Sequence, residues 1–333
     1  MKVQKLLKNL LRPIVRPIKT KYEDLWSKPI LDEAASKLKA FDNLDSPYII
    51  VAVPGCLCEL ELCLRHIPEQ QNLLIVDNGL TAWEKSWFND KHPQIPVLVL
   101  GNKMIDHARV LDMILDNFGK AFGILDYDCF VFEPSLFDKL SKIDSDVMMN
   151  ALFCQTDNQL NIKTPETFIA FLNTDLINQI KQKFGVNSQS KYFFEISNEV
   201  RSQLKLIGVD KDHPLEQYKN YFDTTRLWTA LGLSLGYKVN FIKELNTREA
   251  DGVFHIGAGS SHTSLNRYWA KRGTYFWRRA LETCPYSELQ EQYYRNYGPM
   301  KTADIHEKVP GLVKELGNVY FENVEKIVAR WEK

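Results

Sequence analysis

The sequence predicts an α/β fold: a mostly parallel sheet flanked by helices, with a basic N-terminal extension and a helical C-terminal extension. Between residues 46 and 128, short apolar runs alternate with segments whose apolar residues recur at helical spacing, which is the pattern of βαβ units. The runs are rich in β-branched residues and stop at Pro, Gly, Asn or Asp, as buried parallel strands do. The chain has 333 residues, 44% hydrophobic and 25% charged, so it can bury a large core.

The first half of the chain supplies four strands and two helices. The strands are expected at 46–55, 72–79, 96–102 and 121–128. The segments 59–67 and 107–118 carry apolar residues at helical spacing and are expected to be the connecting helices.

The later elements are less regular. Segments 146–153 and 166–176 predict strands in a mixed part of the sheet. In 223–242, Asp223 is expected to be the N-cap of a helix that Gly236 ends, and a last strand follows.

Three parts are expected along the chain. Residues 1–45 form a basic amphipathic extension, residues 46–265 the α/β domain that contains the sheet, and residues 266–333 a helical extension. In residues 2–20, apolar residues are expected on one side of a helix and Lys and Arg on the opposite side. Pro13 and Pro17 are expected to interrupt this helix. This segment either lies on an anionic membrane surface, as a peripheral contact, or is a cationic extension docked on the domain or left mobile.

Charge and composition exclude several classes of partner. The 42 basic and 42 acidic side chains balance, which argues against nucleic acid as the main partner. No apolar run approaches the length needed to cross a membrane. The six cysteines lie in a long chain without a recognisable secretory leader, so free thiols and a cytoplasmic location are expected.

Two carboxylates, Asp126 and Asp128, end the fourth predicted strand in the stretch "FGILDYDCFVFEP". At the end of a strand both can reach one site, where unpaired they would repel each other. A divalent cation removes this repulsion, and Mg²⁺ and Mn²⁺ combine one or two carboxylates with phosphate oxygens. The pair therefore indicates a metal–diphosphate site, unless Asp128 caps a turn and Asp126 pairs with a lysine.

A second candidate segment is "GVFHIGAGSSH", which combines His255 with the small-residue run 257–261. Glycines let consecutive backbone N–H groups close around an anion, and Gly257 and Gly259 are the residues expected to do so. An imidazole as a third ligand favours Mn²⁺ over Mg²⁺. The alternative is a glycine loop beside a hydrogen-bonded surface histidine.

The order of these motifs resembles the GT-A glycosyltransferases, especially the bacterial branch often called family two. It comprises a strand ending in Pro, one ending in "VDNG", a "HARVLD" helix, the "LDYD" strand, a late helix that begins at an Asp, and finally a His-Gly loop. The resemblance covers about residues 46–262. It implies transfer of a sugar from a nucleoside-diphosphate sugar to an acceptor hydroxyl, in the assembly of a surface polysaccharide or glycolipid.

The resemblance also implies roles for the acidic motif and the histidine. Asp128 would ligate the metal directly, and Asp126 would contact the ribose or a metal-bound water. His255 would complete the metal shell.

Nucleotide contacts are implied at the strand ends. Asp77 would recognise the base, and Val53 and Pro54 would form the loop under the nucleotide. The chain departs from the family here, with "GCLCE" after the strand where many members have Thr or Ser followed by Tyr-Asn. His107 and Arg109 begin the helix after the third strand, so they either face the diphosphate or lie on the surface.

In an inverting enzyme a carboxylate takes the proton of the acceptor hydroxyl. Asp223 is the candidate, since family members often place that acid at the start of a helix. A helix N-terminus lowers a carboxyl pKa and weakens a base, so a plain N-cap is the alternative. Glu195, Glu199 and Glu216 are further candidates, and a retaining enzyme needs no such base.

Three rival functions fit parts of the pattern. A haloacid-dehalogenase-type phosphatase also has Asp-x-Asp after a strand, but usually on its first strand and with Thr or Val where Phe130 stands. A nucleotidyltransferase has a related fold, but its Gly-rich basic loop is missing from "VPGCLCELE". A membrane-surface scaffold with a lapsed transferase fold is the non-enzymatic alternative.

Overall fold

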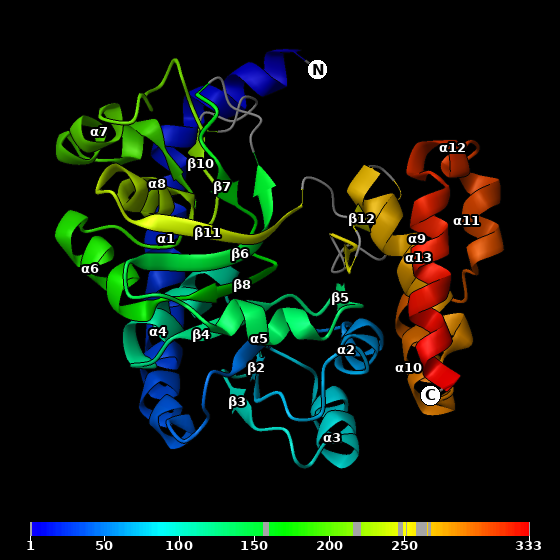
Figure 1. The fold of residues 1–333 in the computed structure, drawn as a ribbon. Coiled ribbons are helices and arrows are strands. Elements are labelled where there is room, and N and C mark those ends of the chain that lie inside the picture. The colour runs from blue at the N-terminus through cyan, green and yellow to red at the C-terminus, as the bar shows by residue number, and fades with distance from the viewer. Residues whose placement is uncertain are drawn as a thin grey trace.

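The computed structural model describes residues 2–155, 160–215, 221–245, 249–250, 252–257, 265 and 268–332. A central sheet runs through the molecule in the strand order β11-β6-β8-β4-β1-β2-β3 (Figure 1). Its strands are β1 Tyr48–Ala52, β2 Leu73–Asp77, β3 Val97–Val99, β4 Phe122–Leu125, β6 Val147–Gln155, β8 Ile169–Leu172 and β11 Lys238–Leu245.

Most neighbouring strands of this sheet are parallel. The pairs β3–β2, β2–β1, β1–β4 and β11–β6 are parallel, whereas β8 is antiparallel to both β4 and β6. The short strand β7 (Thr164–Pro165) adds an antiparallel pair to β6. The predicted α/β fold with a mostly parallel sheet is therefore confirmed, including its mixed part.

Two small sheets lie beside the central one. One contains β5 Cys129–Val131, β12 Glu249–Ala250 and β13 Val253–His255, and the other pairs β9 Lys191–Tyr192 with β10 Tyr221–Phe222.

Alternation along the strands divides the apolar residues between two cores. On β1, Tyr48 and Ile50 belong to one core and Ile49 to the other. Helices α2 Leu57–Leu64, α3 Ala82–Lys91 and α5 Ser135–Ser141 supply the first core. The second core takes α4 His107–Asn117, α6 Thr174–Phe184, α7 Asn198–Lys205 and α8 Arg226–Ser234.

Gly123 of β4 shows how closely the first core is packed. A Cβ atom at this position would lie 2.3 Å from the ring of the buried Tyr48. Only glycine leaves room for that ring, which also contacts Phe137 and Phe171.

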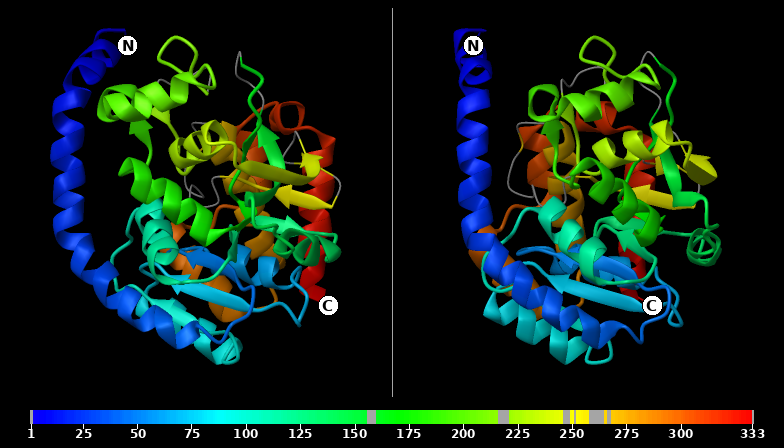
Figure 2. Two further views of the ribbon diagram at one scale, coloured as in Figure 1. Left: turned by 60° about the vertical axis from the view of Figure 1, so that its left-hand side comes forward. Right: turned by 90° about the vertical axis from the view of Figure 1, so that its left-hand side faces the viewer.

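Helix α1 (Lys2–Leu38) is continuous through Pro13, Pro17 and Pro29, so the predicted interruption at the first two prolines is wrong. Each proline removes a backbone donor and favours bending, and the long helix bends around one side of the domain (Figure 2). It contacts α4 and β3 and leads into the 3₁₀ turn Lys39–Phe41.

The C-terminal helices pack on the first core. They are α9 Tyr268–Thr283, α10 Ser287–Tyr297, α11 Thr302–Lys308, α12 Leu312–Leu316 and α13 Asn318–Val328, followed by the turn Ala329–Glu332. Trp277 Nε1 donates to Gly55 O at 3.2 Å, and the Tyr293 hydroxyl bonds Leu57 N and Glu84. The boundary expected near residue 265 stays a prediction, and the helices beyond it share a core with β1.

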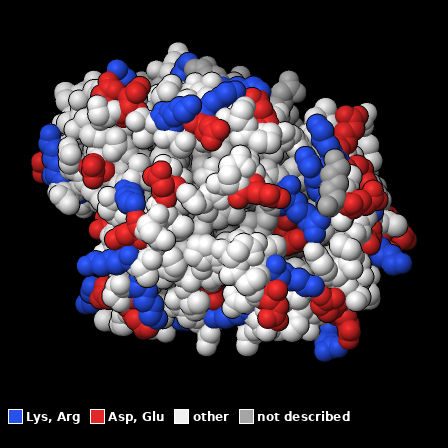
Figure 3. Space-filling model, turned by 60° about the horizontal axis from the view of Figure 1, so that its bottom comes forward, with Lys and Arg blue, Asp and Glu red and all other residues white. Residues whose placement is uncertain are grey.

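Charges on the surface are mixed. On the face seen in Figure 3, basic and acidic side chains are interspersed without an extended field of one sign. No helix in the described part of the chain has the length and apolar content to span a bilayer.

Candidate metal centre

Parallel pairing brings three strand ends to one edge of the sheet. Ala52 of β1 lies opposite Asp77 of β2, and Tyr48 lies opposite Gly123 of β4. The loop after β1, the "VDNG" turn and the Asp126–Asp128 turn therefore leave the sheet side by side, as the sequence predicts.

The turn after β4 positions the two aspartates. The backbone N–H of Asp126 donates to Phe168 O at 2.8 Å, and the carbonyl of Asp126 accepts from Cys129 N at 3.0 Å. The chain then continues as β5. The Asp126 side chain stays 38% exposed, whereas that of Asp128 is 6% exposed, so Asp126 gives the site its opening to solvent.

Strand β13 brings the histidine back to this turn. It pairs antiparallel with β5, with His255 opposite Cys129, and Ile256 N donates to Asp128 O at 3.0 Å. The antiparallel ladder thus places His255 next to Asp128, although more than a hundred residues of strands and helices lie between them in the sequence.

The three side chains converge. His255 Nε2 lies 3.1 Å from Asp128 Oδ1 and 3.6 Å from Asp126 Oδ2. One ligand atom from each residue lies within 4.8 Å of the others, and among the described residues no other His, Cys, Asp or Glu set does so. Two carboxylates and an imidazole form a donor set that suits Mn²⁺.

Neighbouring groups fix the imidazole and its strand. The Phe168 ring stacks on His255 with centroids 3.9 Å apart and an interplanar angle of 18°. The buried Arg272 of α9 donates to Ile256 O at 3.1 Å and to His255 O at 3.4 Å. The ring plane and backbone of His255 are therefore held from two sides.

A buried carboxyl lies close to the aspartates. Glu59, in the first turn of α2, is fully buried, and neither of its oxygens has a hydrogen-bond partner outside its own residue in the described part of the chain. Burial raises its pKa well above the usual range, and the charge of Asp128 adds to the rise. The carboxyl therefore keeps its proton to a higher pH than a solvent-exposed glutamate does.

Asp77 is engaged by its own turn. Oδ1 accepts hydrogen bonds from Gly79 N at 3.1 Å and Leu80 N at 2.8 Å, and Oδ2 lies 3.0 Å from Lys85 Nζ. Burial raises its pKa, against the influence of Lys85 and of these hydrogen bonds. Base recognition by Asp77 stays a prediction, and it requires this buried carboxylate to turn from Lys85.

The loop after β1 is half-buried at Val53 and Pro54. Gly55 follows with φ 87°, and its N–H donates to the Glu84 carboxylate at 2.7 Å. The same Glu84 caps α3 through Thr81. The shape of this loop therefore comes from α3 as well as from β1, and its role under a nucleotide stays a prediction.

The start of α4 separates the two residues expected there. His107 is exposed in the first turn, where a diphosphate contact stays a prediction. Arg109 is buried and pairs with Asp24 and Glu23 of α1. As it stands, its guanidinium is engaged by α1.

Asp223, the expected base, does not begin a helix as the sequence predicts. Helix α8 begins at Arg226, with Thr225 at φ 68° before it, so Asp223 is not its N-cap. The Asp223 carboxylate accepts from Thr224 N at 2.9 Å, in a turn whose Arg226 N donates to Asp223 O. The alternative of a plain N-cap is therefore wrong, and a role of Asp223 as the base stays a prediction.

The remaining candidates are the other expected bases and the glycines expected to bind the diphosphate. Glu195 pairs with Arg16 of α1 at 2.9 Å, and Glu199 is exposed in the first turn of α7. Gly257 is buried with φ 71°, a conformation that suits glycine. Gly259 and Glu216 lie outside the described residues.

Sequence reasoning missed Phe168, Arg272 and Glu59. Phe168 lies within the predicted strand 166–176 and Arg272 in an aromatic and basic stretch, and neither has a local signal for contact with His255. Glu59 begins the predicted helix 59–67 two residues before a second acid, Glu61, so the sequence does not distinguish it as buried.

Comparison with known proteins identifies the class of enzyme. Residues 32–177, less than half of the chain, match a family model described as the StrH glycosyltransferase N-terminal domain. The chain is a glycosyltransferase. No curated protein matches it.

Two solved structures show distant similarity. Mannosyltransferase PcManGT from Pyrobaculum calidifontis, solved in complex with GDP-Man and Mn²⁺, is 10% identical with a TM-score of 0.36, over 93% of this chain and 96% of that one. Glycosyltransferase GlyE of Streptococcus pneumoniae TIGR4 is 9% identical with a TM-score of 0.38, over 76% of this chain and 64% of that one.

Proposed function

We propose that the chain is a metal-dependent glycosyltransferase of the GT-A type, which transfers a sugar from a nucleoside-diphosphate sugar to an acceptor hydroxyl. The observation that carries the proposal is the convergence of Asp126, Asp128 and His255 within 4.8 Å at the carboxyl edge of the sheet. Assembly of a surface polysaccharide or glycolipid, and a cytoplasmic location, stay predictions from the sequence.

The three side chains would hold Mn²⁺, or Mg²⁺. Bound there, the metal supplies positive charge against the negative charge that develops on the leaving diphosphate. The chain's own contribution is placement: the β5–β13 ladder aligns His255 with Asp128, and Phe168 fixes the imidazole plane. Asp126 is the most exposed of the three side chains and lies on the solvent side of the cluster.

Other residues complete the proposed site. Gly257 opens the small-residue loop whose N–H groups are expected to face the diphosphate. Asp223 is the proposed base for the acceptor hydroxyl in an inverting reaction, and its half-buried place before α8 keeps it outside the helix. Val53, Pro54, Asp77 and His107 are the proposed nucleotide contacts.

Thermal unfolding with nucleoside diphosphates, each with and without Mn²⁺, tests the proposal. At a ligand concentration 100 times Kd, binding adds about 2.7 kcal/mol of stability, so we expect Tm to rise by several degrees only when Mn²⁺ and the right nucleotide are both present. Asp128→Asn and His255→Ala should abolish the rise. Asp90→Asn, at an exposed aspartate of α3, should leave it unchanged.

Two results would contradict this assignment. Indifference to every nucleotide with Mn²⁺ would favour the scaffold. Hydrolysis of a generic phosphate ester that is lost in Asp126→Asn would instead favour the phosphatase.

A further inference from the structure

The outward side of α1 carries an exposed apolar stripe. Val15, Ile18, Tyr22 and Leu25 are 54%, 66%, 64% and 70% exposed. Their spacing of three and four residues puts them on one side of the helix. These four residues are called the outer face of α1 below.

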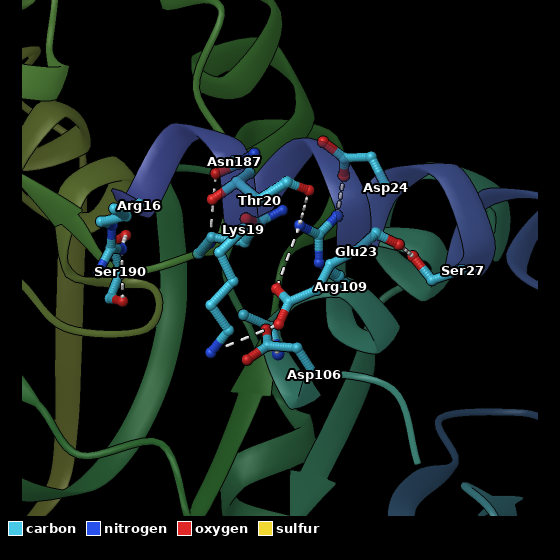
Figure 4. A network of polar contacts seen from close by, with 12 residues as sticks. Arg16, Lys19, Thr20, Glu23, Asp24, Ser27, Asp106, Arg109, Asn187 and Ser190 are labelled. Atoms are coloured by element: carbon cyan, nitrogen blue, oxygen red, sulfur yellow. Dashed lines mark hydrogen bonds and ion pairs between the residues drawn. The ribbon is translucent and has the colours of Figure 1, made fainter. Parts of the chain in front are cut away.

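The opposite side of α1 is fixed to the domain. Arg16 pairs with Glu195 at 2.9 Å and donates to Ser190. Arg109 of α4 bonds Asp24 and donates to Thr20 O at 3.2 Å, as Figure 4 shows. Further along, Ala34 and Leu38 enter the second core. The helix therefore cannot rotate to bury its outer face without breaking these contacts.

The charges around the outer face are mostly positive. Lys19 and Lys28 have side chains 73% exposed, and Lys21 is exposed as well. Between residues 12 and 28 the only acids are Glu23 and Asp24. Both contact Arg109, and Glu23 also lies 3.5 Å from Lys19. The positive stretch ends at the exposed Asp32, which pairs with Lys28.

We propose that the outer face of α1 binds an anionic lipid surface. A helix lying in a membrane interface presents an apolar strip flanked by Lys or Arg, whose heads reach the lipid phosphates. The outer face and its flanking cations extend from Arg12 to Lys28, about 26 Å of helix at about 1.5 Å per residue. The proposed membrane contact therefore lies in Arg12–Lys28, whereas the sequence alone places it in residues 2–20.

A second copy of the chain is a poorer occupant. Coiled-coil pairing needs the apolar repeat to persist over several heptads, and here the positions after Leu25 are Pro29 and Asp32. Cations on both flanks of the stripe would also face each other in a dimer and repel. A lipid surface that carries negative charge turns the same cations into an attraction.

Flotation of the full chain with lipid vesicles tests the inference. Vesicles of phosphatidylcholine with a minor share of phosphatidylglycerol should bind the chain. Vesicles of phosphatidylcholine alone should bind it at least about tenfold more weakly, and this difference should shrink at high salt. The double variant Ile18→Glu/Leu25→Glu should lose at least about tenfold of the binding to anionic vesicles.

Matched variants separate the outer face from exposed apolar residues in general. Leu206→Glu/Val313→Glu changes two residues that are 71% and 48% exposed elsewhere, and it should bind as the unaltered chain does. Should the Ile18/Leu25 variant unfold, Lys19→Gln/Lys21→Gln gives the second test, with weaker binding and a smaller salt dependence expected.

The inference is overturned in three ways: if the unaltered chain ignores anionic vesicles, if both double variants on α1 bind as well as the control, or if sedimentation shows a dimer that Ile18→Glu/Leu25→Glu dissolves while vesicles stay unbound. It does not depend on the proposed catalytic function. Vesicle binding and the response of Tm to nucleotide and Mn²⁺ are measured separately, so either can fail alone.

Discussion

His255 Nε2 lies 3.1 Å from Asp128 Oδ1, although 127 positions separate the two residues. Their meeting depends on the β5–β13 ladder, in which His255 lies opposite Cys129. Everything else at the proposed centre is arranged around this pair: Asp126 on its open side, Phe168 on the imidazole face, and Arg272 on the backbone of β13.

Removing the ring that stacks on His255 tests whether the imidazole must be oriented. Phe168→Leu should weaken Mn²⁺ binding about tenfold, because groups that orient a metal ligand typically matter by that amount. Titration of the protein with Mn²⁺, followed by the electron paramagnetic resonance of the free ion, measures this. Phe171→Leu removes a ring of β8 that contacts Tyr48, and it should cost stability without changing Mn²⁺ affinity. Equal affinity in both variants would show that the stack has no orienting role.

Glu59 predicts a loss of stability as pH rises. Its folded-state pKa is raised, so between its unfolded and folded pKa values the native state holds a proton that the unfolded state has released. In that window, which opens above about pH 4.3, stability falls with pH. Glu59→Gln should remove this contribution, so its Tm relative to the unaltered chain should rise from pH 5 to pH 8. Glu69→Gln, at an exposed position, should show no such trend.

His66 predicts the opposite slope at lower pH. Burial lowers its pKa to about 4, although the Leu62 carbonyl acts in the other direction. The unfolded state therefore takes up a proton first, and stability falls as pH drops from about 6.5 towards about 4, by up to about 3 kcal/mol. His66→Phe, which keeps a ring beside Phe130 and Phe132, should flatten the curve in urea unfolding between pH 7 and 4. An unchanged slope would mean that another group is responsible; His213→Gln, at an exposed histidine, is the control.

We expect Arg109 to hold helix α1 against α4. Arg109→Gln should cost about 2 kcal/mol, the scale of hydrogen bonds to charged groups, and should speed amide hydrogen exchange in residues 12–28 while leaving the central sheet protected. The buried guanidinium joins Asp24 and Thr20 of α1 to α4. Arg201→Gln removes an exposed arginine that donates to Phe193 O at 2.8 Å and should leave exchange in α1 unchanged. Unchanged exchange in Arg109→Gln would place the attachment elsewhere.

The local pattern of the sequence determined the strands and the edge at which they end. The apolar run at 46–55 became β1, the run at 72–79 became β2, and the Asp126–Asp128 pair lies at the end of β4 as expected. These features follow from short-range chemistry: β-branched apolar residues form buried strands, and parallel strands bring their carboxyl ends together. The helix start at Asp223 and the break in α1 were wrong, because the backbone of a turn and the packing of a long helix override single-residue preferences.

Tertiary structure alone decided what surrounds the proposed centre. The distance of His255 from Asp128 depends on the register of the antiparallel pair β5–β13. These two strands are far apart in the sequence, so local patterns do not determine that register. Likewise, the burial of Glu59, the stack of Phe168 and the outward direction of Val15, Ile18, Tyr22 and Leu25 depend on which helices pack against which sheet face. Local preferences act over a few residues, whereas these contacts are set by the packing of elements distant in the chain.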